Sequence, residues 1–321
     1  MKFEELYKFV VETGVRNDPR GGAVVGKQLK TESDRYGKLS KEEKNEYDTE
    51  KLSNPYADTR MLFGDPATPV KSLMVGIDIE TPELLLLHVL RGSGRKVDIA
   101  LTHHPEGRAF ANFYDVMNMQ ADILHKFGVP INIAEAIMEP RIKEVSRKVL
   151  PQNHSRAVDS AKLLNITFMS AHTPADNCVT GYLQKQFDAQ KPETIEGVIK
   201  LLKAIPEYKS AVRDSRGPVI FVGSKEKKAG KIFVDMTGGT EGSTEVFEKL
   251  ANSGVGTVVG MHMSEEHYKK AEKYHINVVI AGHISSDNLG MNLLLDAVEK
   301  KFGKLEVIEC SGFRRISRRK Q

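Results

Sequence analysis

The sequence lacks tryptophan entirely and has only two cysteines, Cys178 and Cys310, among its 321 residues. Two cysteines cannot form a disulfide framework, and without a Cys-x-x-Cys pair a thiolate zinc site is excluded. No apolar run approaches the ~18 residues that a membrane-spanning helix requires. The N-terminal stretch is acidic and short of apolar residues, unlike a signal peptide. We therefore expect a cytoplasmic protein with no membrane partner.

Strong net charge is also absent. The chain carries 47 Lys and Arg residues against 43 Asp and Glu residues, a formal charge of +4. This value is too small over such a length to indicate binding to nucleic acid. The surplus is partly local, because the last ten residues, GFRRISRRKQ, contain five basic residues and no acid. Two interpretations of this tail stay open, a solvated chain end and a contact with an acidic partner.

Aliphatic residues are scarce between residues 16 and 53, a stretch dominated by charge and glycine. Such a segment cannot bury enough surface to offset the entropy of ordering it as a domain. We predict an extended surface insertion at about residues 16–53, with one solvated helix around residues 40–52.

From about residue 70 onward, apolar strands alternate with amphipathic helices. A strand at 70–79, a helix at 81–96 and a strand at 97–105 form the first βαβ unit, whose strands should be parallel. The alternation predicts an α/β protein with two α/β lobes, each a mixed, largely parallel sheet flanked by helices. The first lobe is assigned to residues 1–165 plus 288–321 and the second to residues 166–287.

Histidines gather where predicted strands end, which is where open α/β sheets build their sites. They are His103, His104, His172, His262 and His283. Asp287 follows His283 by four residues, a spacing that brings both side chains to one face of a helix, where they can chelate an ion. The alternative is that Asp287 caps the helix and His283 makes an ordinary turn bond. His172 and Asp176 repeat this spacing, here predicted in a loop because Pro174 interrupts.

These side chains form a mixed nitrogen and oxygen donor set. It consists of His103, His104, His283, Asp176 and Asp287. Such a set suits zinc, manganese or iron and disfavours calcium. Because a carboxylate can bridge, two divalent ions about 3.5–4 Å apart become plausible. Adjacent histidines at a strand end can then offer one nitrogen to each ion, and we expect this site in the cleft between the lobes.

Further residues are candidates for proton transfer or substrate binding. Glu106 and Glu241 are possible general bases, because metal-bound water needs a proton acceptor within reach. His172 is expected to orient Asp176 or touch substrate, the alternative being a core hydrogen bond. His262 and His267 flank a helix start at the same edge, where they serve substrate binding or proton transfer, or are simply solvated.

A glycine-rich turn, TGGTEGST at 237–244, opens a later helix. The backbone N–H groups around Gly238 and Gly239 could hold a phosphate. The turn lacks the lysine of a P-loop and the G-x-G-x-x-G spacing, so a plain strand-to-helix turn is the alternative.

Several motifs occur in a specific order. They are NPYADTRMLFGDPATPVKSLMVGIDIETPELLL, LTHHP, SAHTPAD, TGGTEGSTEVFEKLANSG and HYKKAEKYHINVVIAGHISSDNLGM. Over about residues 54–313 the chain resembles the Nif-three-like (NGG-interacting-factor-three-like) family of dinuclear metal proteins, also labelled GTP cyclohydrolase type 2 homologues. The resemblance implies metal ligands at His103, His104, Asp176, His283 and Asp287. It also implies a histidine near His267 at the site rim and a ring-shaped homo-oligomer, often hexameric.

The chain departs from the family pattern at two places that matter for chemistry. Asp287 stands where the family usually has glutamate, which is one methylene longer. Glu106-Gly107-Arg108 follow the paired histidines where the family often has bulky apolar residues. We therefore expect Glu106 and Arg108 to contact a substrate.

Two functions from different classes follow. The first is a metal-dependent hydrolase acting on a nucleotide or another phosphate-containing small molecule, cyclohydrolase-like by resemblance alone. The alternative is a non-catalytic role in metal storage or delivery, or a protein-interaction module that uses the 16–53 insertion and the basic tail as partner surfaces.

Overall fold

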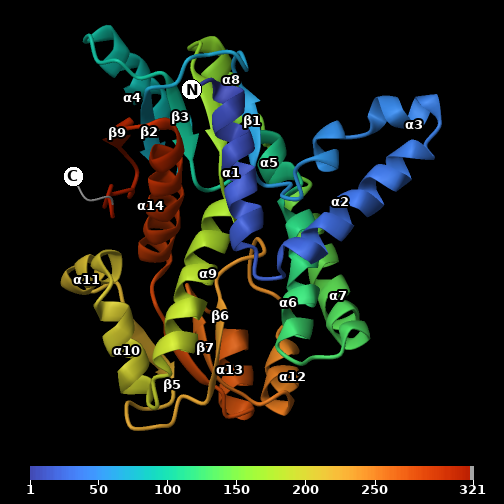
Figure 1. The fold of residues 1–321 in the computed structure, drawn as a ribbon, viewed down its shortest axis with the longest axis vertical. Coiled ribbons are helices and arrows are strands. Elements are labelled where there is room, and N and C mark those ends of the chain that lie inside the picture. The colour runs from blue at the N-terminus through green and yellow to red at the C-terminus, as the bar shows by residue number, and fades with distance from the viewer. Residues whose placement is uncertain (319–321) are drawn as a thin grey trace.

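Two β-sheets organise the chain in the computed structural model, which describes residues 1–318 (Figure 1). The five-stranded sheet has the order β1 (Arg60–Phe63), β4 (Thr167–Ser170), β3 (Ile99–Thr102), β2 (Ser72–Gly76) and β9 (Glu306–Glu309). The four-stranded sheet has the order β5 (Val219–Val222), β8 (Asn277–Ile280), β7 (Val255–Gly260) and β6 (Lys231–Asp235). Each sheet is parallel except at one edge, where β1 and β5 run antiparallel to β4 and β8. The predicted α/β class with two largely parallel sheets is confirmed.

The two sheets follow one plan, because β1, β4, β3 and β2 correspond in order and direction to β5, β8, β7 and β6. In each sheet, the strand beside the antiparallel edge leads directly into a long helix. These helices are α9 (Thr173–Gln190), which follows β4, and α14 (His283–Phe302), which follows β8. The first turns of α9 and α14 therefore lie at the carboxyl ends of strands, one from each sheet.

The helices α9 and α14 each leave one sheet and pack against the other. Val179, Leu183 and Phe187 of α9 join the apolar core over the four-stranded sheet. Leu294, Leu295 and Val298 of α14 join the core under the five-stranded sheet. The two helices also pack on each other, and a Cβ at Gly290 of α14 would lie only 2.5 Å from the carbonyl oxygen of Ala175. Each lobe is thus held by a helix that begins in the other.

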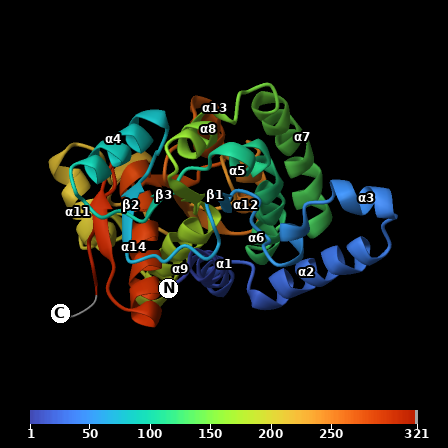
Figure 2. The same ribbon diagram turned by 90° about the horizontal axis from the view of Figure 1, so that it is seen from above.

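Helices cover both faces of the five-stranded sheet (Figure 2), with α4, α5 and α8 on one side and α1, α9 and α14 on the other. The remaining elements are α1 (Phe3–Asn17), α2 (Gly22–Gly37), α3 (Lys41–Glu46), η1 (Thr49–Leu52), α4 (Thr81–Gly92), α5 (Gly107–Ala111), η2 (Phe113–Asn118), α6 (Met119–Lys126), α7 (Ile131–Val149), α8 (Arg156–Leu163), α10 (Ile195–Lys203), α11 (Pro206–Arg213), α12 (Val246–Asn252) and α13 (Glu265–Lys273). Within residues 1–318, no helix has both the length and the apolar character needed to cross a bilayer.

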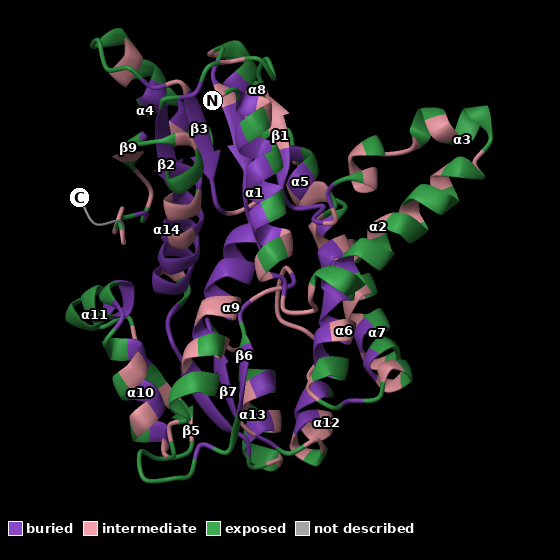
Figure 3. Cartoon of the chain, in the orientation of Figure 1, coloured by how far each residue is buried: buried purple, intermediate pink, exposed green. Residues whose placement is uncertain are grey.

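The predicted surface insertion at residues 16–53 is a helical arm, formed by α2 and α3, that projects from the body (Figures 1 and 3). The solvated helix predicted around residues 40–52 corresponds to α3 and η1, whereas α2 was not predicted. Composition correctly indicates poor burial, since Val25 is the one buried residue of α2 and α3 has none. The helices instead pack on each other: the rings of Tyr36 and Tyr47 lie 4.9 Å apart, and Tyr47 donates to Glu32 at 2.5 Å. Helix propensity and these local pairs stabilise the helices of the arm, although neither helix has an apolar face that packs on the core.

Pro174 does not place Asp176 in a loop, as the sequence predicted. It occupies the first turn of α9, where a helix has no intrahelical partner for the N–H that proline lacks. Asp176 consequently sits on the helix itself, as Asp287 does on α14. The strand Thr167–Ser170, which the predicted boundary at residue 166 assigns to the second lobe, pairs within the five-stranded sheet.

Candidate metal centre

The two adjacent histidines lie immediately after β3, where the backbone turns over the end of the neighbouring strand. The N–H of His103 donates to Gly76 at 3.0 Å, and the N–H of His104 donates to Ile77 at 2.8 Å. These hydrogen bonds position the backbone beyond the end of β3. The alternation of side chains along a strand no longer applies there, so both imidazoles can face the same side. His103 is fully buried, whereas the side chain of His104 is 27% exposed.

Asp287 lies at the centre of the cluster, since its two oxygens face different partners. Its Oδ1 is 3.5 Å from Nε2 of His103, which is also 3.5 Å from Oδ1 of Asp176. Its Oδ2 is 3.6 Å from Nε2 of His104 and 3.6 Å from Nε2 of His283. We call His103, Asp176 and Asp287 the inner set, and His104, His283 and Asp287 the outer set.

Buried atoms in this cluster lack hydrogen-bond partners. They are Nε2 of His103, Oδ1 of Asp176 and both carboxylate oxygens of Asp287. Buried polar atoms are costly without a partner, and four in one place require an explanation. Donor atoms around a tetrahedral ion with bonds of 2.0–2.1 Å stand about 3.4 Å apart, close to the separations between these atoms. The cluster could therefore hold metal ions.

Charge in the cluster also suits cations. Partial burial lowers the pKa of His283 to about 4, so this imidazole is neutral and has its lone pair available at neutral pH. Burial opposes ionisation of Asp287, but His103 outweighs it and keeps the pKa of the carboxyl below its ordinary value. Burial raises the pKa of Asp176 to about 6, a cost that a bound cation would remove.

Hydrogen bonds to the opposite ring nitrogens orient the histidines toward the cluster. Nδ1 of His103 donates to the carbonyl of Ala171 at 3.2 Å, and Nδ1 of His104 donates to Asp78 at 2.6 Å. Such bonds fix the tautomer that leaves Nε2 free for a metal. Sequence reasoning missed Asp78, although it closely follows β2, beside the strand end that carries both histidines.

His172 lies where the sequence placed it, beside Asp176, with Nε2 3.6 Å from Oδ2. Its Nδ1 is 2.8 Å from Asp58, a fully buried carboxylate that also accepts from Thr173 at 2.6 Å. Burial alone would lower the pKa of His172, but Asp176 and Asp58 raise it to about 9. Asp58 was also missed, although it belongs to the NPYADTR motif from which the resemblance was drawn.

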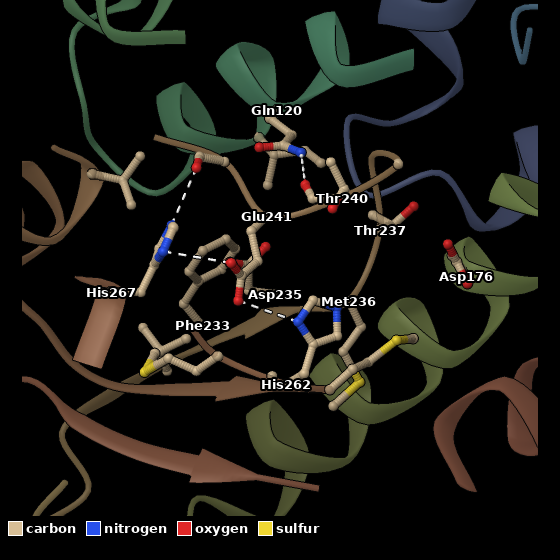
Figure 4. Close-up of a pocket in the computed structure, with 18 of the residues that line it drawn as sticks. Gln120, Asp176, Phe233, Asp235, Met236, Thr237, Thr240, Glu241, His262 and His267 are labelled. Carbon is tan, nitrogen blue, oxygen red and sulfur yellow. Dashed lines mark hydrogen bonds and ion pairs between the residues drawn. The ribbon is translucent and has the colours of Figure 1, made fainter. Parts of the chain in front are cut away.

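A cavity of about 90 Å³ adjoins the outer set and extends over the carboxyl edge of the four-stranded sheet (Figure 4). His172, Asp176, His283 and Asp287 line its metal end. Its far wall carries Glu241, which accepts from His262 at 3.2 Å and from the N–H of Ser264 at 2.7 Å. The ring of His262 stands 5.0 Å from that of His283. The cavity is thus lined by candidate metal ligands that follow strands of both sheets.

The sequence profile of the Duf34/NIF3 (NGG1p interacting factor 3) family matches residues 142–314, which is more than half of the chain. The chain belongs to the Duf34/NIF3 family. The matched range contains Asp176, His283 and Asp287, whereas His103 and His104 precede it. The family resemblance drawn from the motifs is therefore confirmed.

One solved structure of the family shares this fold, and two others are more distantly similar. A NIF3 superfamily protein from Sphaerobacter thermophilus is 27% identical, with a TM-score of 0.68 over 80% of this chain and 91% of that one. Reduced HcgD from Methanocaldococcus jannaschii is 16% identical (TM-score 0.48; 78% and 87% covered). TTHA1606 from Thermus thermophilus is 14% identical (TM-score 0.42; 78% and 86% covered). No curated protein matches the chain.

Other predicted site residues of this Duf34/NIF3 chain lie around the cavity or away from it. His267 lines the wall, but Nδ1 contacts Ser264 at 2.6 Å and Nε2 contacts the carbonyl of Gly242 at 3.1 Å, so both nitrogens are already engaged. Glu106 is half-buried at the start of α5, where burial and the neighbouring Glu80 and Asp78 raise its pKa to about 7.

Arg108 and the glycine-rich turn are engaged by the protein itself. Arg108 forms an ion pair with Glu50 and donates to the carbonyl of Met61 at 3.1 Å, so it faces η1 and β1. Gly238 has φ +94°, and a Cβ there would lie 2.7 Å from the side chain of Gln120. The same side chain donates to the carbonyls of Gly238 and Thr240, each at 2.7 Å, while Gly239 lines the cavity. Close packing of Gly238 against α6 and of Gly239 against η2 explains these glycines without a phosphate.

Replacing Asp58 with asparagine is expected to weaken metal binding by about 10–100-fold, the usual cost of losing an orienting carboxylate. The amide keeps the shape of the side chain but removes the charge that holds His172 and Thr173. His172 is then no longer held in place beside Asp176. Metal titration with a competing chelator measures the change. Asp65→Asn, at an exposed turn before β2, is the matched control and should leave affinity unchanged. Equal affinity of the Asp58 variant and the wild type would refute the orienting role.

Proposed function

We propose that this Duf34/NIF3 protein binds two divalent transition metal ions, zinc, manganese or iron, and is a metal-dependent hydrolase of a small molecule. The observation that carries the proposal is the pair of donor sets that share Asp287, with four buried donor atoms lacking any partner. Two ions bound there would supply Lewis acidity and lower the pKa of water toward neutrality.

The two donor sets differ in how far their side chains are exposed to solvent. His103, Asp176 and Asp287 of the inner set are all buried. In the outer set, the side chains of His104 and His283 are 27% and 42% exposed, and His283 lines the cavity. A substrate would therefore meet the outer set through its exposed histidines, whereas the inner set borders the cavity only at Asp176 and the shared Asp287.

His262 is the residue best placed to move a proton in this cavity. Glu241 holds its Nδ1 at 3.2 Å, and among the described residues no hydrogen-bond partner occupies Nε2. The hydrogen bond that His262 donates to Glu241 raises the pKa of His262, and His262 in turn helps to hold the pKa of Glu241 down to about 2. The carboxylate stays ionised and orients the imidazole, which can accept or deliver a proton at Nε2.

The cavity lining limits the substrate. Phe233, Met236, Met261 and Met263 contribute apolar walls, and no Lys or Arg among residues 1–318 lines it. A phosphate in this cavity would have the metal centre as its cationic partner. The lining therefore favours a compact substrate with an apolar or aromatic body, whose carbonyl or phosphoryl group meets the outer set.

The test is turnover by purified protein loaded with Zn²⁺, Mn²⁺ or Fe²⁺ on a panel of phosphomonoesters, phosphodiesters, nucleotides and cyclic amides. We expect activity that requires metal and disappears in His104→Ala. His262→Gln should keep full metal content and lose about 10²–10⁴-fold in kcat, the usual contribution of a positioned acid or base.

Two results would count against this function. Full metal occupancy with no turnover on any substrate, together with transfer of metal to an apo acceptor protein, would establish metal delivery instead. Unchanged kcat in His262→Gln would remove that residue from proton transfer while leaving the metal centre in place.

Assembly into a homo-oligomer also remains a proposal. Its support in this chain is an apolar cluster on the outer face of α4, where Leu85, Leu86 and Val89 are about half exposed. Contiguous exposed apolar side chains of this kind mark association surfaces.

A further inference from the structure

A second concave site lies beside α9, one helical turn beyond the metal centre. We call it the α9 groove; it is bounded by Asn17 of α1, Lys126 of α6, Thr180 of α9 and Ile232 of β6. Its volume is about 920 Å³, within the usual range of ligand-binding clefts. Ile123 separates it from the metal cavity, because this side chain lines both.

The groove contains an unpartnered buried hydroxyl. Thr180 is 3% exposed, and its Oγ1 has no hydrogen-bond partner. A threonine within a helix can donate to the carbonyl four residues earlier, but Thr180 makes no such bond. Since Thr180 lines the groove, its hydroxyl is free to bind an occupant.

Cations without acidic partners line the same groove. They are Arg16, Lys126, Lys185, Lys191 and Lys231, none of which forms an ion pair in the described part of the chain. Lys126 and Lys231 donate only to backbone carbonyls, each at 2.6 Å. A concave wall lined by one sign of charge concentrates a positive potential.

The acids of the groove do not cancel this charge. Asp18 is held by Arg20 at 2.9 Å, and Glu193 lies 3.6 Å from a sixth cation, Lys228. Asp188 accepts from Gln184 and is the remaining carboxylate of the lining. The local balance therefore favours an anion, in contrast to the metal cavity, whose described lining has no Lys or Arg.

The groove also has an apolar floor, formed by Ile123, Phe187 and Val234, all buried. Cations next to an apolar surface match a molecule with an anionic end and an apolar body. We propose that the α9 groove binds an organic phosphate, with the body on this floor and the phosphate among the lysines near Thr180. This site is separate from the metal centre and does not require the ions.

The experiment is calorimetric titration of the full-length, metal-loaded protein with ADP and, separately, with inorganic pyrophosphate. Saturable binding of ADP is expected, with pyrophosphate binding more weakly because it lacks an apolar body. Lys185→Glu and Lys191→Glu should each weaken ADP binding at least tenfold, because charge-assisted contacts are among the strong ones. Thr180→Val, which keeps the side-chain shape, should weaken it about 3–10-fold through the lost hydrogen bond.

Two controls distinguish this site from general charge and from the metal centre. Lys203→Glu reverses an exposed lysine of α10 outside the groove and should leave binding unchanged. His104→Ala should lose metal and keep ADP binding. The proposal is overturned if ADP does not saturate, if Lys203→Glu weakens binding as much as Lys185→Glu, or if His104→Ala abolishes it. Circular dichroism and the thermal midpoint verify that Thr180→Val is folded.

Discussion

Asp287→Asn is expected to abolish the binding of both proposed ions. Each oxygen of Asp287 faces a different donor set, so one substitution removes a charged ligand from both at once. A neutral amide keeps the volume but loses the charge that makes a carboxylate a strong ligand for a hard cation. Elemental analysis after equilibrium dialysis should show the metal content falling from two ions per chain to nearly none.

Asp176→Asn is the matched comparison, since Asp176 belongs to the inner set alone. About one ion per chain should remain in that variant. Glu241→Gln changes a carboxylate of the cavity wall outside both sets and should retain both ions. If Asp287→Asn retained one tightly bound ion, the bridging position assigned to Asp287 would be wrong.

Arg60→Met is expected to lower the free energy of unfolding by about 3 kcal/mol or more, because removing one partner of a buried ionic group leaves the others uncompensated. The Arg60 side chain is 2% exposed. It donates to the carbonyls of Tyr56 at 2.7 Å and Thr59 at 2.9 Å. It also lies 3.1 Å from Asp48 and 3.2 Å from Glu50, which joins the base of the arm to the five-stranded sheet.

Equilibrium urea unfolding measures this loss. Arg35→Met is the control, since Arg35 lies on the arm with its side chain 70% exposed and pairs with Glu32 only at 3.9 Å. Its effect should stay within about 0.5 kcal/mol, as for most surface positions. Comparable losses in the two variants would contradict the anchoring role of Arg60.

The sequence predicted those elements whose pattern is local. Most strands and helices from residue 70 onward follow from apolar alternation, and His283 and Asp287 stand at a helix start as predicted, whereas the helix that carries Asp176 was predicted as a loop. The edge strands β1 and β5 escaped prediction because they are only partly buried, so neither gives a buried apolar run. Helix α2 of the arm escaped because it buries only Val25, and its contacts are with Tyr47, which follows α3.

Parts of the site depend on contacts between distant segments. Asp58 reaches His172 across 114 residues, and Asp78 reaches His104 across 26. No spacing rule in the sequence encodes such pairs. Arg108 was predicted to contact a substrate, but in the structure it pairs with Glu50 and lies away from the cavity. Glu50 lies at the base of the arm, whose path the sequence did not reveal.

The exchange of α9 and α14 between the lobes has a mechanical consequence. The backbones of α9 and α14 touch at Gly290 and Ala175, and each helix packs into the apolar core of the opposite lobe. A hinge-like separation of the two lobes would break these contacts. Because each donor set takes residues from both lobes, this connection fixes the spacing of the donors within each set. The dimensions of the cavity therefore limit which molecules can reach the proposed metal centre.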